Sequence, residues 1–174
     1  MVSAKIATIV ALCVQLVAIA ASADEIESHH AHEHGVASLN VGIEAGRVEL
    51  EFDSPAINVI GFEHTPRTDA EKAAASRAQR TLQAAGRLFV LSGEAECRTT
   101  STEVVAPTWV EGESHADYEA RYAFQCAKPR LLHAIDVRLV NELAAQTKLR
   151  VQIVANGKQT SAELTRNDSL LRIG

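Results

Sequence analysis

Residues 27–35 read Glu-Ser-His-His-Ala-His-Glu-His-Gly, a segment that holds four of the chain's seven histidines. These four candidate metal ligands are His29, His30, His32 and His34. An imidazole with a reference pKa near 6.5 is largely neutral at neutral pH, so its lone pair can bind a borderline-soft ion such as Zn(II). In an extended chain alternate side chains share one side, and a loop could add His29 or Glu33 to the same sphere. The pattern predicts an open, exchangeable site suited to capturing zinc and passing it on.

Imidazole ligands alone do not select zinc. The Irving-Williams order gives Cu(II) tighter binding to the same nitrogens, and Ni(II) also suits them. A copper or nickel chaperone is therefore the alternative within the same class. The other alternative gives the segment no metal role and makes the chain a structural adaptor of the cell envelope.

Two more histidines stand beside carboxylates. Glu63 and His64 are adjacent, and a turn could bring both to one ion. His115 and Asp117 have the spacing that places two side chains on one face of a strand. Each of these residues could instead be an ordinary polar side chain whose hydrogen bonds are satisfied.

The amino-terminal residues indicate export. Lys5 precedes an apolar run over residues 6–21, and the small residues 21–23 complete a cleavable signal peptide over residues 1–23. The run is short for a membrane anchor and has no basic stop-transfer flank. We expect a periplasmic protein that begins at Asp24, with residues 24–35 as a flexible His-rich segment because nothing in them can form a core.

The cysteines fit an oxidising compartment. Cys13 lies inside the signal peptide, which leaves the pair Cys97 and Cys126. Such a pair predicts a disulfide, although two buried thiols remain an alternative. Neither cysteine has the CxxC neighbour that a zinc-thiolate site would need.

Residues 36–174 are expected to form a single α+β domain, in which an antiparallel β-sheet carries one main helix. Alternation over 37–43 and 47–52, with Gly46 between them, predicts a hairpin. Thr68 and Glu71 form a capping-box pattern that opens a helix over 69–85, with Gly86 as its stop.

Further strands are expected in the carboxyl-terminal half of the chain. Their ranges are 88–91, 97–105, 118–126, 135–140, 149–154, 160–164 and 170–173. Asn156-Gly157 is a strong hairpin turn signal. Residues 131–145 could instead be helical, and periodicity does not decide between the two.

Several function classes are disfavoured. The chain has 17 basic and 22 acidic residues and a net charge of −5, which argues against nucleic acid or anionic lipid as a partner. It contains no HExxH, GxSxG or phosphate-binding glycine loop. We therefore expect a binding protein and not an enzyme.

Several motifs together resemble a known family. They are His32-Glu33-His34-Gly35, the segment 61–68 (Gly-Phe-Glu-His-Thr-Pro-Arg-Thr), Cys97, and 122–126 (Tyr-Ala-Phe-Gln-Cys). In these the chain is similar to the ZrgA-type zinc-uptake proteins of Gram-negative bacteria. The resemblance implies a periplasmic protein that binds zinc and assists a zinc ABC importer or its periplasmic binding protein, without catalysis.

The resemblance also points to particular positions. His32, His34, Glu63 and His64 match the family's motifs. The family often carries a long His-, Asp- and Glu-rich insertion between the strands of the two cysteines, whereas this chain has only residues 104–117 there, with His115 and Asp117 as a remnant. The resemblance therefore implies a smaller zinc capacity.

Overall fold

The predicted amino-terminal hairpin is present in the computed structural model, which describes residues 33–109, 116–143 and 148–173. Strands β1 (Val36–Glu44) and β2 (Arg47–Pro55) pair antiparallel. Every second side chain of β2 from Val48 to Phe52 is buried, as the alternation requires. The two turn residues, Ala45 and Gly46, both have positive φ, at 47° and 83°.

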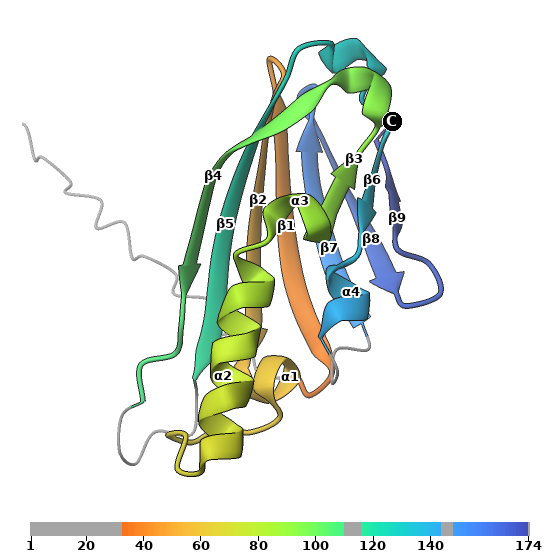
Figure 1. The fold of residues 1–174 in the computed structure, drawn as a ribbon. Helices are drawn as coiled ribbons and strands as arrows, with labels where there is room; N and C mark the ends of the chain where they lie inside the picture. The colour runs from red at the N-terminus through yellow and green to blue at the C-terminus, as the bar shows by residue number, and fades with distance from the viewer. Residues whose placement is uncertain (1–32, 110–115, 144–147, 174) are drawn as a thin grey trace, which may run out of the picture. The chain divides into compact units, whose positions relative to one another are not determined.

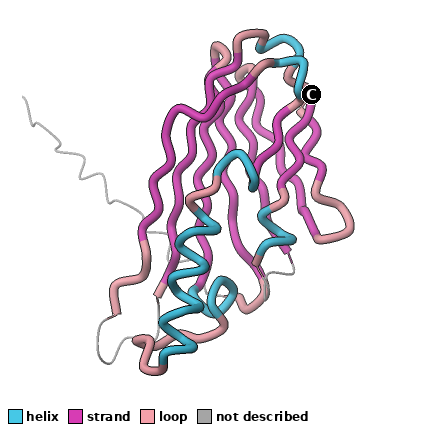
Figure 2. The backbone as a smooth tube through the Cα atoms, in the orientation of Figure 1, coloured by secondary structure: helices cyan, strands magenta, loops and turns pink. Residues whose placement is uncertain are grey.

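A six-stranded sheet is built around this hairpin, in the order β4-β5-β2-β1-β7-β8 (Figures 1 and 2). The added strands are β4 (Cys97–Val105), β5 (Asp117–Cys126), β7 (Lys148–Ala155) and β8 (Lys158–Thr165). All neighbours are antiparallel except β1 and β7, which run parallel. The predicted antiparallel sheet is therefore confirmed for four of the five pairs, and the parallel pair was not predicted because parallel partners need a long connection that leaves no local turn signal.

A second sheet has three strands, β3 (Phe89–Leu91), β6 (Ala134–Val137) and β9 (Leu170–Arg172). The expected strand over 135–140 ends early, because helix α4 (Leu139–Glu142) begins just after it. The ring of Phe89 lies 4.8 Å from that of Tyr122 in β5. The small sheet thus shares a core with the inner face of the large one.

Helix α2 (Asp69–Leu82) is the one long helix among the described residues. Its capping box forms as predicted, but it ends at Leu82, and Gly86 lies inside the short helix α3 (Ala85–Leu88). Leu82 is fully buried, and its carbonyl accepts a 2.9 Å hydrogen bond from the Tyr122 hydroxyl. This bond holds α2 on the face of the sheet that Figure 1 shows behind it.

The remaining elements are short. Helix α1 (Ala56–Ile60) follows β2 directly, and two 3-10 turns, η1 (Gly93–Ala95) and η2 (Pro129–Leu131), flank the cysteine end of β4 and β5. Cys97 and Cys126 face each other across these strands and form the predicted disulfide. No helix in the described ranges is long and apolar enough to cross a membrane.

Candidate metal site

Two segments meet where β1 begins, and Asn58 joins them. One is Glu33 to Gly35, just before β1, and the other is the helix α1. The side chain of Asn58, which is 1 % exposed, accepts a 2.6 Å hydrogen bond from the Gly35 amide. It also donates a 2.8 Å bond to the carbonyl of Val36. The backbone on the carboxyl side of His34 is therefore fixed to α1.

A histidine and a carboxylate from the predicted ligand set lie close together here. Nε2 of His34 is 4.0 Å from Oε2 of Glu63, in the loop that follows α1. The His34 side chain is 70 % exposed, whereas that of Glu63 is 22 % exposed. A largely exposed imidazole thus stands beside a carboxylate that is mostly covered.

The Glu63 carboxylate has an oxygen whose hydrogen-bonding capacity is unused. This is Oε1, the oxygen that does not face His34, and it is buried with no hydrogen-bond partner among the described residues. A buried carboxylate oxygen is costly unless it is paired with a donor or a cation. Two ligands on one tetrahedral zinc ion, with bonds of about 2.0–2.1 Å, lie roughly 3.3 Å apart. The His34 and Glu63 atoms could reach that spacing by a shift of well under 1 Å.

Glu33 supports this segment from the other side. Its carboxylate forms a 2.6 Å ion pair with Arg150 in β7, and its carbonyl accepts a bond from the Val36 amide. Gly35 adds a bond from the Lys148 amide to its carbonyl. Glu33, considered above as an extra ligand, is therefore engaged with the sheet.

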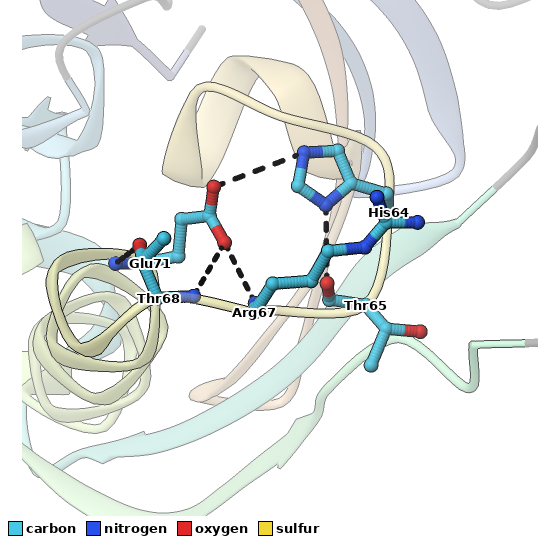
Figure 3. Close-up of polar contacts among 5 residues, drawn as sticks. All are labelled: His64, Thr65, Arg67, Thr68 and Glu71. Atoms are coloured by element: carbon cyan, nitrogen blue, oxygen red, sulfur yellow. Dashed lines mark hydrogen bonds and ion pairs between the residues drawn. The ribbon is translucent and has the colours of Figure 1, made fainter.

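His64 has a different set of neighbours from Glu63. Its Nδ1 lies 3.0 Å from the Thr65 carbonyl oxygen, and its Nε2 lies 4.0 Å from Oε1 of Glu71 (Figure 3). Its ring stacks on Phe62, with 5.0 Å between the ring centroids. The hypothesis that one turn brings Glu63 and His64 to the same ion gains no support from these contacts. His64 instead belongs to the start of α2.

Glu71 is held by backbone amides at the same place. Its Oε2 accepts bonds of 3.0 Å from the Thr68 amide and 2.7 Å from the Arg67 amide (Figure 3). These two bonds, with a smaller contribution from His64, keep the pKa of Glu71 below its ordinary value of 4.5. Glu71 is therefore ionised at neutral pH, and its carboxylate is hydrogen-bonded at the amino terminus of α2.

The other predicted ligands are placed only in part. Asp117 is the first residue of β5, opposite Pro55, and so lies at the same end of the sheet as Asn58. Four predicted ligands lie outside the described residues: His29, His30, His32 and His115. Within 33–109, 116–143 and 148–173, no three His, Cys, Asp or Glu side chains gather around one point. The described part of the site thus offers one nitrogen and one carboxylate.

Sequence reasoning did not single out Asn58. The signal available was a lone amide inside the apolar run 56–62, since a buried polar side chain must find partners. The partners themselves, Gly35 and Val36, are set by tertiary structure and leave no such signal.

Comparison with known proteins agrees with the motifs. No curated protein matches the chain. Residues 31–173, which include His34, Asn58 and Glu63, match the family model described as ZrgA family zinc uptake protein. The match spans well over half of the chain. The chain therefore belongs to the ZrgA family of zinc uptake proteins.

Proposed function

We propose that this protein captures Zn(II) in the periplasm and raises its supply to a zinc ABC importer or to that importer's periplasmic binding protein. Zinc is the cargo in this role, and no catalysis is assigned to the chain. Membership of a zinc uptake family supports the choice of metal. The leader-like residues 1–23 support the compartment.

The observation that carries the proposal is the meeting of His34 and Glu63. The nitrogen of a largely exposed imidazole lies 4.0 Å from a carboxylate whose other oxygen is buried without a partner among the described residues. Imidazole nitrogen and carboxylate oxygen are both ordinary zinc ligands. An exposed nitrogen can also release its ion, as delivery to another protein requires.

Further ligands would come from the preceding histidines. His32 and His30 stand two and four residues before His34, a spacing that puts all three on one side of an extended chain. His29 can replace either of them. These histidines lie outside the described residues, and their part in the proposal rests on the sequence alone.

The proposal is tested by growth under metal limitation. A strain that lacks this protein is grown with zinc, copper or nickel limiting, with and without a plasmid copy. We expect a defect only under zinc limitation, restored by the wild type and by His133→Ala, a variant of an exposed histidine in another part of the chain. We expect no restoration by His34→Ala. A defect confined to copper or nickel limitation, or full restoration by His34→Ala, would overturn the proposal.

A further inference from the structure

Asn58 stands out because it is a fully buried amide with no role in the regular structure around it. It lies in the five-residue helix α1, where its neighbours Ala56 and Val59 are buried apolar residues. Both ends of its amide are used, and both partners are backbone groups of the segment that leads into β1. The hydrogen-bonding capacity of Asn58 is thus directed at the chain next to His34.

The same element that carries Asn58 also carries Glu63. Helix α1 ends at Gly61, whose φ of 89° and amide bond to the Ile57 carbonyl reverse the chain. Phe62 and Glu63 follow directly, and the Phe62 ring stacks with those of His64 and Trp109, at 5.0 and 6.4 Å. One end of this unit therefore holds Gly35, while the other presents the carboxylate.

The left-handed backbone conformation of Gly35 is stabilised by its hydrogen bond to Asn58. Gly35 has a φ of 82°. Glycine adopts this conformation without strain, but it adopts many others as easily. The hydrogen bond from its amide to Asn58 selects this conformation, in which His34 turns toward Glu63. Glu33 and Gly35 are also held by Arg150 and by the Lys148 amide in β7, and the Asn58 bond adds the link from Gly35 to helix α1.

We infer that Asn58 is a positioning residue for zinc binding, which holds the backbone at Gly35 and Val36 so that the His34 nitrogen stands beside the Glu63 carboxylate. This inference rests on the proposed role of His34 and Glu63 as zinc ligands. Asn58 does not touch the ion. It lowers the conformational entropy that the chain loses when zinc binds, and a preorganised ligand pair therefore binds zinc more tightly.

A double-mutant cycle separates this role from a general contribution to folding. Zinc affinity is measured by competition with a chromophoric chelator for the leader-free protein, for Asn58→Ala, for His34→Ala and for the double variant. We expect Asn58→Ala to weaken zinc binding about tenfold in the wild-type background, or about 1.4 kcal/mol. We expect it to change affinity less than twofold when His34 is already absent.

Thermal unfolding without metal provides the control for stability. Val137→Ala truncates a fully buried residue of β6 in the small sheet and should lower the melting temperature without changing zinc affinity. If Asn58→Ala does not fold, Asn58→Leu keeps the branched side-chain shape while removing both hydrogen bonds. Each variant is assayed well below its melting temperature.

The outcomes distinguish the two claims. Loss of affinity in Asn58→Ala that disappears in the His34→Ala background supports positioning. An equal loss in both backgrounds, or no loss while His34→Ala itself binds weakly, overturns positioning and leaves the proposed function standing. Unchanged affinity in His34→Ala overturns the proposed ligand role and the positioning inference with it.

Discussion

His34 and Glu63 stand 4.0 Å apart, Nε2 to Oε2, because the hairpin of β1 and β2 returns the chain to the end of the sheet where it began. His34 precedes β1, and Glu63 follows β2 after the single turn of α1. The folded domain thus supplies a carboxylate to the last histidine of the cluster. Among the described residues no three metal-ligating side chains lie together, so in the proposed function this pair is the part of the zinc site that the structure describes.

Removing the His34 imidazole should weaken zinc binding. We expect His34→Ala to lower zinc affinity at least tenfold, or about 1.4 kcal/mol, because the variant loses a nitrogen ligand. His133 is the matched control, since it is also exposed and its Nδ1 lies 2.9 Å from the Leu131 carbonyl oxygen. Chelator competition at neutral pH measures both. A wild-type affinity in His34→Ala, or an equal loss in His133→Ala, would contradict the assignment.

Glu71 should make the protein sensitive to acid. Its pKa in the folded state is below 4.5, so its carboxylate stabilises the fold above that pH, and the contribution is lost as the pH falls through the folded value. We expect the free energy of unfolding of the wild type to fall more steeply than that of Glu71→Gln between about pH 5 and pH 3. Urea denaturation at a series of pH values measures this. Parallel curves would show that Glu71 contributes nothing to the acid response.

The Cys97–Cys126 disulfide should be a major source of stability. The two residues are 29 positions apart, and closing a loop of that size contributes about 3 to 4 kcal/mol in the chain-entropy model. We expect the double variant Cys97→Ala with Cys126→Ala to lose most of that free energy of unfolding. Its zinc affinity should stay unchanged below its melting temperature, because neither cysteine belongs to the proposed site. A stability equal to the oxidised wild type would contradict the prediction.

A substitution in the β1–β2 turn should make the protein more stable. Ala45 has a φ of 47°, a left-handed conformation that alanine adopts at a cost and asparagine tolerates better. Since Gly46 also has positive φ, the sequence Asn-Gly would match the preferred hairpin turn. We expect Ala45→Asn to raise the free energy of unfolding by about 0.5 to 1 kcal/mol. A variant that unfolds at or below the wild-type denaturant midpoint would refute this.

Features with local signals could be predicted from the sequence. Two of them depend on residues close together in the chain: the hairpin around Gly46 and the capping box of Thr68 and Glu71. The disulfide depends on the fact that only two cysteines remain after the leader. The parallel contact of β1 with β7 could not be predicted, because the two strands lie far apart in the chain. The end of α2 at Leu82 could not be predicted either, because the helix-favouring residues continue beyond it and form the short helix α3, where Ala85 and Leu88 are buried.

The candidate metal site could also be predicted only in part. His34 and Glu63 could be named as candidate ligands from residue type and motif. Their meeting could not be predicted, because adjacency in the chain suggested Glu63 with His64 instead. The structure pairs Glu63 with a residue from before β1 and leaves His64 beside Glu71. Asn58, which binds the backbone of Gly35 and Val36, belongs to no metal-ligand motif, so the sequence did not indicate it.

The most direct test of the account compares two carboxylates that each lie beside a histidine. Calorimetric zinc titration at neutral pH is performed on the leader-free protein, on Glu63→Gln and on Glu71→Gln. Both carboxylates have an oxygen 4.0 Å from an imidazole nitrogen, which belongs to His34 for Glu63 and to His64 for Glu71. We predict that Glu63→Gln weakens zinc binding at least tenfold, while Glu71→Gln binds like the wild type. Wild-type binding by Glu63→Gln, or no heat of binding in the unaltered protein, would contradict the central claim.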